Sequence, residues 1–485
     1  MKRTLLTLAA ALFLLPASAQ QVPEWLKEGI LYHIYPSSFK DSDGDGIGDL
    51  EGIRSKLPYV KSLGANTIWL SPVFRSEFED GGYDITDFYR IDPRFGTNSQ
   101  LVQLVREAHD LGIRVCLDLV AGHTSDKHPW FRQSSEADPE LQYSDYYIWS
   151  DSKDSLPTKK FVRSDAARDG NYMKNFFDIQ PALNYGYLHP DPAQPWQQGY
   201  DDPGPTAVRN ELKNIISFWM DKGVDGFRCD VAPLVPLEFW KRARAEVATV
   251  RPGCFWLCES VERGFHVAAR AQGFASLSDA ELYQAFDAAY DYDVYPYFRD
   301  YLEGTITLVQ YADRLDAQEW LYPDNYVKLR FLENHDRARA AHILPEETVR
   351  RNWTAFNYFQ RGLTLVYAGQ EVDDPHVPSL FDKDPVHWQT GRDQSDFLIR
   401  LAAIKRDPIF AEGSYTLTAL PHDVLLAVYE QNGRRVAGLF SLRGASALVR
   451  FPAPNGVYHD SITGRPVEIY ENQLATDGQP LILEL

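Results

Sequence analysis

The stretch Gly226-Phe227-Arg228-Cys229-Asp230 decides the fold, because it is an apolar run that ends on a carboxylate. Two further runs repeat this pattern: residues 255–257 lead to Glu259, and residues 327–332 lead to Asp336. Short apolar runs of this kind are typical of strands that are buried on both faces, as in a parallel sheet. Acids at the carboxyl ends of such strands lie where α/β barrels place their chemistry. The three runs therefore predict a barrel with an acidic site at one end.

Strand and helix patterns alternate along most of the chain. Expected strands cover residues 30–35, 67–70, 115–120, 224–227, 255–257, 283–286, 327–332 and 364–367. Expected helices cover residues 50–63, 98–111, 208–222, 237–250, 297–302, 347–361 and 396–405. Asn98 or Ser99 is the expected N-cap of the second helix. Such alternation implies a parallel sheet, and eight strand–helix units close it into a barrel. The predicted fold class is therefore α/β, with a TIM (β/α)8 barrel over residues 22–406.

Two segments depart from this alternation. Residues 124–206 are rich in Pro, Asp, Tyr and Trp and show little helical period. A structureless loop of that length is improbable in a compact domain, so we expect an irregular domain inserted after the third strand. From about Phe410, apolar and polar residues alternate with period two between turn signals. This pattern predicts an all-β sandwich over residues 410–485.

The charge of the chain restricts its partners. The 485 residues carry a formal net charge of −19. An acidic protein repels polyanions, so we expect no nucleic-acid partner and favour a neutral or cationic ligand. The chain also contains 27 Tyr and 11 Trp residues, which fits the stacking of sugar faces on aromatic rings but fits a large core as well.

The first residues have the pattern of an export signal. Lys2 and Arg3 precede an apolar run over residues 5–15, and Ala17-Ser18-Ala19 follows. This arrangement predicts a signal peptide over residues 1–19, cleaved after Ala19. The run is too short for a membrane span, and no later stretch is apolar enough for one. We therefore expect an exported protein, periplasmic or secreted, with no membrane span after signal removal.

An acidic loop after the first expected strand predicts a Ca²⁺ site. Oxygens at alternate positions, with glycines to turn the backbone, are how a loop wraps a hard cation. Gly52 occupies the loop position where an EF-hand needs a bidentate Glu, so the loop is no complete EF-hand. The alternative is an acidic turn with unrelieved repulsion between four acids. The five expected ligands are the carboxylates of Asp41, Asp43, Asp45 and Asp49 and the carbonyl of Ile47.

The strand-end acids are suited to glycosidic bond cleavage. That reaction needs a carboxylic acid to protonate the leaving oxygen and a carboxylate on the opposite side of the sugar. Arg228 projects to the same side of its strand as Asp230 and would keep this acid ionised as a nucleophile. Glu259 follows an apolar run, which favours its neutral form and hence an acid role. Asp336 is the third candidate acid.

Two histidines stand beside these acids. His123 and His335 are suited to donate hydrogen bonds to sugar hydroxyls. Taken singly, each of these residues is explained better by a buried ion pair or a satisfied core histidine than by catalysis. Their arrival together at the ends of the third, fourth, fifth and seventh expected strands favours catalysis.

Six motifs give the chain a family resemblance. Over roughly residues 23–406, and in its β tail, the chain resembles the α-amylase family of glycoside hydrolases, glycoside hydrolase family 13, in its oligosaccharide-cleaving branch. The motifs are DLVAGH (118–123), GFRCD (226–230), FWLCE (255–259), FLENHD (331–336), QPALN (180–184) and DGGYD (80–84). The resemblance implies that Asp230 is the nucleophile, Glu259 the general acid and base, and Asp336 a transition-state stabiliser that grips sugar hydroxyls.

The resemblance also implies roles for the surrounding residues. Tyr83 would stack under the sugar at the cleavage point, with Arg228, His123 and His335 around it. Asp118 would support the site from the end of the third strand. The loop over residues 41–49 is similar to the calcium loop of members related to oligo-1,6-glucosidases.

Departures from the family pattern leave the substrate open. Pro233 and Leu234 stand where many endo-acting amylases carry a Lys-His pair, and Ala182 stands where relatives commonly have Asp. Val231 resembles members that accept α-1,6 bonds. Asp80 is a candidate substrate-binding residue that, paired with a base, would close the pocket for exo action. Endo-amylase, α-glucosidase and transglycosylating activities all remain compatible with the sequence.

We therefore predict a calcium-containing, retaining α-glucan hydrolase. Its substrate would be an α-glucan or malto-oligosaccharide with α-1,4 bonds, and α-1,6 bonds are an open alternative. A transglycosidase or isomerase with trehalose- or cyclodextrin-type chemistry is the alternative within the family. A non-catalytic glucan-binding protein is the alternative from another class, although such proteins usually lose one of the acids that are present here.

Overall fold

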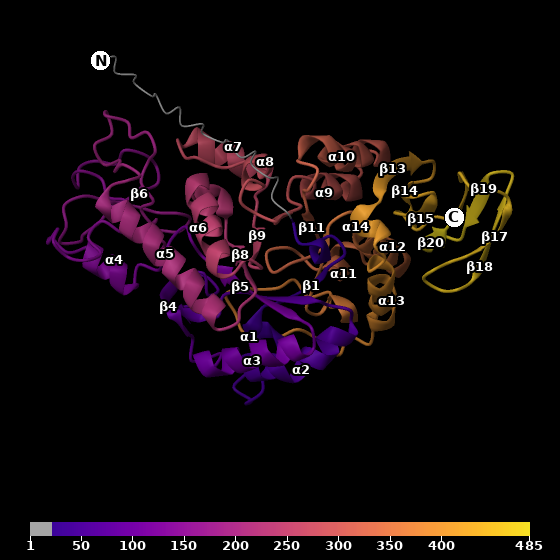
Figure 1. The fold of residues 1–485 in the computed structure, drawn as a ribbon, viewed down its shortest axis with the longest axis horizontal. Coiled ribbons are helices and arrows are strands. Elements are labelled where there is room, and N and C mark those ends of the chain that lie inside the picture. The colour runs from indigo at the N-terminus through magenta and orange to yellow at the C-terminus, as the bar shows by residue number, and fades with distance from the viewer. Residues whose placement is uncertain (1–21) are drawn as a thin grey trace, which may run out of the picture.

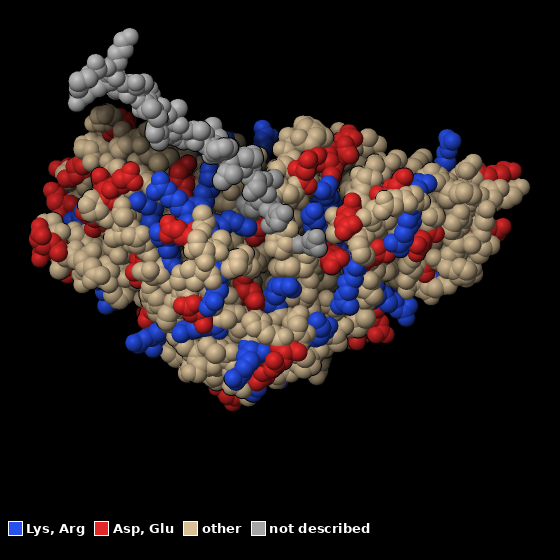
Figure 2. All heavy atoms as spheres, in the orientation of Figure 1, with Lys and Arg blue, Asp and Glu red and all other residues tan. Residues whose placement is uncertain are grey.

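A computed structural model describes residues 22–485 and arranges them as a barrel followed by β-sheets (Figure 1). The expected signal peptide over residues 1–19 lies outside the described residues. Across residues 22–485, every helix is too short or too polar to cross a bilayer. Asp and Glu side chains are spread over the whole face that Figure 2 shows.

The barrel consists, within residues 22–485, of eight parallel strands in the order β1-β12-β11-β10-β9-β8-β5-β2. Each strand pairs in parallel with both neighbours, and Phe227 lies opposite Leu117 on one side and Trp256 on the other. The strands are β1 (Ile30–Ile34), β2 (Thr67–Leu70), β5 (Arg114–Leu119), β8 (Gly226–Cys229), β9 (Phe255–Cys258), β10 (Ala288–Tyr290), β11 (Lys328–Arg330) and β12 (Leu363–Tyr367).

Helices surround the barrel, and most of the longer ones bury an apolar face. In α3 (Asn98–Asp110), Leu101, Leu104, Val105 and Ala108 are buried, which is the spacing of one helical face. The longer remaining helices are α2 (Leu50–Ser62), α5 (Pro203–Asp221), α6 (Leu237–Val250), α7 (Arg263–Ala271), α9 (Tyr295–Glu303), α10 (Leu308–Leu321), α12 (Glu347–Phe359) and α13 (Ser395–Lys405). The one-turn helices are α1 (Pro36–Phe39), α8 (Asp279–Leu282), α11 (Ala340–Ile343) and α14 (Ile409–Glu412).

Three local predictions were wrong. The sixth strand is not residues 283–286 but β10, and Tyr283 instead donates a hydrogen bond to the carbonyl of Val327 at 2.9 Å. The helix expected from residue 208 begins at Pro203, since proline is tolerated in a first helical turn. The N-cap of α3 is Thr97, whose hydroxyl accepts from the Gln100 amide at 3.3 Å, and not Asn98 or Ser99.

The segment between β5 and α5 contains little regular structure. It holds α4 (Pro129–Ser134) and the short pair β6 (Phe161–Val162) and β7 (Tyr172–Met173). Isolated bridges, His123 to Ala182 among them, tie it to the end of β5. A second excursion precedes it, with β3 (Phe74–Ser76) antiparallel to β4 (Ile85–Ile91). Both segments lie at the carboxyl ends of barrel strands.

The C-terminal region forms two antiparallel four-stranded sheets, as the sequence predicted. Their orders are β13-β14-β15-β20 and β16-β19-β18-β17. The first sheet packs against the barrel, where Phe359 of α12 contacts Phe440 and Tyr429 at ring-centroid distances of 5.5 Å. The strands are β13 (Ser414–Leu420), β14 (Val424–Gln431), β15 (Arg434–Ser441), β16 (Ala447–Arg450), β17 (Gly456–His459), β18 (Pro466–Tyr470), β19 (Gln473–Thr476) and β20 (Leu481–Glu484).

Candidate active site

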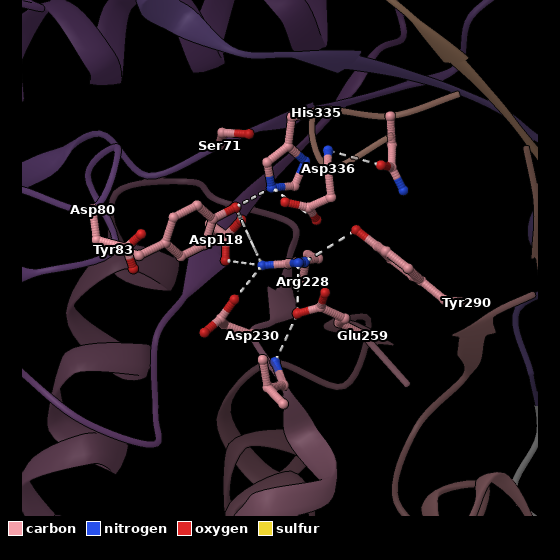
Figure 3. Close-up of polar contacts among 12 residues, drawn as sticks. Ser71, Asp80, Tyr83, Asp118, Arg228, Asp230, Glu259, Tyr290, His335 and Asp336 are labelled. Carbon is pink, nitrogen blue, oxygen red and sulfur yellow. Dashed lines mark hydrogen bonds and ion pairs between the residues drawn. The ribbon is translucent and has the colours of Figure 1, made fainter. Parts of the chain in front are cut away.

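One cavity of about 420 Å³ collects all eight residues that the sequence singled out for catalysis and sugar binding. This volume is in the range of small-ligand sites in proteins. The cavity opens at the carboxyl ends of the barrel strands, where Figure 3 shows the side chains converging. The eight residues are Asp80, Tyr83, His123, Arg228, Asp230, Glu259, His335 and Asp336.

Arg228 lies at the centre of this group, between three carboxyl groups (Figure 3). Its Nη1 contacts Asp118 Oδ1 and Asp230 Oδ1, each at 2.9 Å, and its Nη2 contacts Glu259 Oε2 at 2.7 Å. The side chain of Arg228 is 1% exposed, so these contacts are formed away from solvent. Parallel pairing makes the arrangement possible, because Asp118 on β5 lies directly opposite Arg228 on β8.

The backbone after Asp230 brings the two catalytic candidates together. Val231 adopts φ 35°, in the left-handed region that a β-branched residue rarely enters. In this turn the Val231 amide donates a hydrogen bond to Glu259 Oε2 at 2.9 Å. The carboxyl groups of Asp230 and Glu259 also contact adjacent nitrogens of one guanidinium group. The two acids are therefore neighbours across one small space.

Burial changes the protonation of this cluster. Desolvation raises the pKa of Asp230 well above its usual range, while Arg228 lowers it and Glu259 raises it further. Desolvation likewise raises the pKa of Asp118 to about 6, against the opposing effect of Arg228. Arg228 thus lowers the pKa of Asp230, as the sequence predicted, but the desolvation of this carboxyl group acts in the opposite direction.

Tyr83 and the two histidines form the wall opposite Glu259. The Tyr83 hydroxyl donates to Asp118 Oδ2 at 3.1 Å and lies 2.8 Å from His335 Nε2. The ring of Tyr83 stacks on His335 with a centroid distance of 5.7 Å. His123 Nε2 lies 3.2 Å from the Tyr83 carbonyl, and Asn175 Nδ2 lies 3.0 Å from His123 Nδ1.

The same burial keeps both histidines uncharged. It lowers the pKa of His123 to about 4 and that of His335 to about 3. Both rings are thus neutral near neutral pH, and hydrogen bonding is the role left to them in the cavity.

The loop before Tyr83 needs two glycines. Gly81 and Gly82 have φ of 58° and 103°. A Cβ on Gly81 would lie 2.9 Å from the Tyr35 hydroxyl, which itself donates to the Gly81 carbonyl at 2.7 Å. The DGGYD motif therefore fixes the position of the Tyr83 ring.

Asp336 and Asp80 are the more open acids of the cavity. The side chain of Asp336 is 35% exposed, and its Oδ2 lies 3.4 Å from His335 Nε2. Desolvation raises the pKa of Asp336, against the opposing effect of Arg228. Asp80 accepts a hydrogen bond from Gln180 Nε2 at 2.5 Å. The base expected to pair with Asp80 is thus replaced, within residues 22–485, by the amide of Gln180.

Seven lining residues were missed by sequence reasoning. Most belong to loops that no strand-end pattern marks. Glu262 and Arg337 carried a signal, since they lie three residues after Glu259 and directly after Asp336. The seven are Phe176, Val261, Glu262, Phe265, Tyr292, Arg337 and Leu380.

The acidic loop lies apart from this cavity. Carboxylate oxygens of Asp41, Asp43 and Asp49 lie within 4.8 Å of one another, which suits a hard cation. Asp45 is not part of this group of three; its side chain accepts from the Ile47 amide at 2.7 Å. Asp49 also caps α2 by accepting from the Gly52 amide at 2.7 Å. The structure thus brings together three of the four expected carboxylate ligands.

Comparison with protein families gives two matches. The model "Alpha amylase, catalytic domain" matches residues 33–412. The model "Bacterial Alpha amylase C-terminal domain" matches residues 416–483.

Individual proteins agree with these matches. The crystal structure of an alpha-amylase from Lactobacillus plantarum superposes with a TM-score of 0.81 and 30% identity, over 96% of this chain and 100% of that one. "Maltase A1" of Drosophila melanogaster is 41% identical over 225 residues, 46% of this chain and 38% of its own. "Trehalose synthase/amylase TreS" of Mycolicibacterium smegmatis is 37% identical over 258 residues, 49% of this chain and 40% of its own. The chain thus spans well under two thirds of the length of these two relatives.

Proposed function

Because the chain belongs to the alpha-amylase family, we propose that it hydrolyses α-glucosidic bonds with retention of configuration. The contact of one guanidinium with both Asp230 and Glu259 supports this reaction best, since it sets the two acids side by side. Retaining enzymes have closely spaced carboxyl groups, whereas inverting enzymes leave room between them for a water molecule. The substrate we propose is an α-glucan or malto-oligosaccharide with α-1,4 bonds.

The first step forms a covalent intermediate. Asp230 attacks the anomeric carbon with a carboxylate oxygen, and the bond to the leaving oxygen breaks. Glu259 gives its proton to that oxygen, so the leaving sugar departs as an alcohol. Asp336, the most exposed of the three acids, is free to hold hydroxyls of the reacting ring.

The second step reverses these roles. Glu259, now a carboxylate, takes a proton from water as the water oxygen attacks the anomeric carbon. The ester bond to Asp230 breaks, and the sugar is released with its original configuration. Arg228 compensates the charge that returns to Asp230, and neutral His123 and His335 provide hydrogen bonds.

Proton NMR of the first product formed tests this proposal. With maltose or maltotriose, the new reducing end should appear as the α-anomer before mutarotation. A β-anomer would overturn the retaining mechanism. Asp230→Asn should abolish turnover while the far-ultraviolet circular dichroism spectrum stays that of the parent. Isomaltose and pullulan in the same series report on α-1,6 cleavage.

A second candidate is transfer of the glycosyl group to a sugar instead of water. The similarity to a trehalose synthase/amylase, at 37% identity over 258 residues, favours it. The same intermediate on Asp230 would serve both reactions. Incubation with maltose distinguishes them: hydrolysis yields glucose alone, whereas transfer yields trehalose or longer saccharides.

We also propose a structural Ca²⁺ in the loop that contains Asp41, Asp43 and Asp49. Hard cations prefer carboxylate oxygens, and the three acids that meet there would repel one another without a counter-ion. The ion would neutralise this loop and take no part in the glycosyl transfer. Calorimetric titration of metal-free protein with Ca²⁺ tests the proposal, and an absence of binding heat and of any stability change would overturn it.

Export of the protein is the last part of the proposal. It rests on the residues 1–19 pattern and on the acidic loop, since extracellular fluid is rich in calcium. N-terminal sequencing of the protein recovered from its native host tests it. A mature chain that begins at Gln20 supports export, and a chain that retains Met1 in the cytoplasm contradicts it.

A further inference from the structure

The segment that follows Glu259 forms one rim of the cavity, and we propose that this rim limits the length of the leaving group. The inference rests on the proposed hydrolysis. The segment comprises Val261, Glu262 and the first turn of α7, and its side chains line the cavity together with Phe176 and Arg337. It is held on two sides by contacts that cross the mouth of the cavity.

The first contact is an ion pair. Arg337 Nη2 lies 2.5 Å from Glu262 Oε1, and the two side chains are 25% and 33% exposed. The pair joins the loop after β9 to the loop after β11. Arg337 is itself held over two aromatic rings, with its guanidinium carbon 4.6 Å from the Tyr292 centroid and 5.0 Å from that of Tyr295. The arginine is therefore fixed across the opening and does not extend freely into solvent.

The second contact is between two aromatic rings. Phe265 of α7 lies 5.9 Å, centroid to centroid, from Phe176 of the segment inserted after β5. Phe176 in turn lies against His123, at a centroid distance of 6.2 Å. The rim is thus linked to both the inserted segment and the loop after β11.

The chemistry identifies the side of the sugar on which this rim lies. Glu259 must reach the leaving oxygen, so the wall next to Glu259 faces the leaving group. Val261 and Glu262 continue directly from Glu259. Asp80 and Tyr83 belong to the loop between β3 and β4, on the other side of Arg228 (Figure 3). The rim therefore meets the part of the substrate that departs.

A steric role explains why a partly exposed ion pair stands at this position. Such pairs contribute about 0–1 kcal/mol to folding stability, so this one is a weak structural element. It nevertheless occupies the mouth of the cavity beside the general acid. A long leaving group must pass this ion pair, whereas a short one meets less of the rim. The protein should thus prefer short oligosaccharides to long α-glucans.

The ratio of kcat/KM for maltoheptaose to that for maltose tests this inference. In Arg337→Ala and in Glu262→Ala the ratio should rise about tenfold, because the longer substrate gains more from an open rim. Glu262→Arg and Arg337→Glu should each change this kcat/KM ratio, because each removes the ion pair. The double variant restores a pair of opposite charges and should return the ratio toward the parent value. A matched control is Arg251→Ala, which removes an exposed ion pair with Asp221 just before β8 and β9, at the opposite end of the barrel.

Each result decides the question. A ratio within twofold of the parent in Arg337→Ala overturns the rim as a length filter. If the double variant Glu262→Arg, Arg337→Glu keeps the kcat/KM ratio of the single variants, the proposed role of the ion pair is overturned. Failure of the parent to cleave either sugar contradicts the proposed hydrolysis instead, and leaves the rim to be judged by binding of maltose and maltoheptaose to Glu259→Gln.

Discussion

Two clusters of buried charged residues lie on neighbouring barrel strands and differ in how their charges balance. In the cavity, Arg228 forms ion pairs with Asp118, Asp230 and Glu259. The other cation that lines the cavity, Arg337, is engaged with Glu262. The cavity cluster therefore holds more acid than base.

The second cluster lies on β10 and β11 and is more nearly balanced. Lys328 is paired with Asp279 and with Asp293, the latter at 2.9 Å. Arg330 Nη1 contacts Asp291 Oδ2 at 2.8 Å. The cavity beside Asp291 measures about 20 Å³, room for about one water molecule. This cluster therefore holds the strands together and has no space for a substrate.

The comparison shows what separates a catalytic acid from a structural one. Asp291 directly follows β10, just as Asp230 directly follows β8. Position at a strand end is therefore not sufficient. An excess of acid over base and an adjoining cavity of about 420 Å³ distinguish Asp230.

Neutralising one acid in each cluster is the strongest test of the difference between them. Glu259→Gln should lower kcat/KM on maltose roughly 10²- to 10⁴-fold, because the leaving oxygen loses its proton donor. The loss should be much smaller on α-glucosyl fluoride, whose leaving group needs little protonation. Asp291→Asn, the matched control, should change kcat/KM on folded protein by less than the Glu259 variant on both substrates. Equal losses in the two variants would contradict the distinction.

The two clusters should also differ in stability. Lys328→Met leaves the buried Asp279 and the partly buried Asp293 without their cation, which should lower the free energy of unfolding by about 3–5 kcal/mol. Glu259→Gln removes negative charge from a cluster that has an excess of it, so stability should be unchanged or raised. Urea denaturation of both variants measures the difference. A strong destabilisation by Glu259→Gln would mean that the cavity cluster is structural as well.

The sequence predicted those elements of the fold that have a strong local sequence pattern. The apolar runs that became β8 and β9 were visible because both faces of each strand are buried. The sixth strand was missed because β10 is Ala288-Ala289-Tyr290, and its small residues carry a weak strand signal. The more apolar residues 283–286 follow α8 instead.

The candidate site was predicted less completely than the fold. Residues on strand ends, such as Asp230 and Glu259, could be placed by counting along a strand. Phe176 and Phe265 could not, because their contact depends on where an irregular inserted segment meets the loop after β9. The desolvation that raises the pKa of Asp230 was not predicted either, since it depends on residues that lie close only in the folded chain.

Asp80 is one of the excess acids of the cavity, and its carboxyl group gives the protein a pH-dependent stability. Desolvation raises the pKa of Asp80 to about 6, whereas an unfolded Asp has a pKa of about 3.9. Between these values the native state binds more protons than the unfolded state, so stability falls as pH rises from 4 to 6. The shift corresponds to about 3 kcal/mol at most, and partial exposure reduces this to on the order of 1–2 kcal/mol.

Asp80→Asn should remove this pH dependence. At pH 7 the variant should be more stable than the parent by that amount, and below pH 4 the two should be equal, because the parent carboxyl is then protonated in both states. Chemical denaturation at pH 4, 5, 6 and 7 measures the difference. A parent that gains stability relative to Asp80→Asn as pH rises would show that Asp80 is favourably paired rather than in excess.

The acidic loop is a third environment for acids and should give the smallest effect. It lies outside the cavity, and Asp41 Oδ1 and Oδ2 accept from the amides of Gly44 and Gly46 at 2.6 and 2.7 Å. Backbone N–H groups thus partly stabilise the negative charge of this loop, as the guanidinium of Arg228 does for the acids in the cavity. Free Ca²⁺ at about five times its Kd should add about 1 kcal/mol to stability and about 1 °C to Tm, and a chelator should remove both. Asp43→Asn should weaken this response more than Asp45→Asn, since Asp43 and not Asp45 belongs to the group of three acids. Equal responses in the two variants would mean that the loop binds calcium through all four carboxylates, as its alternating sequence predicts.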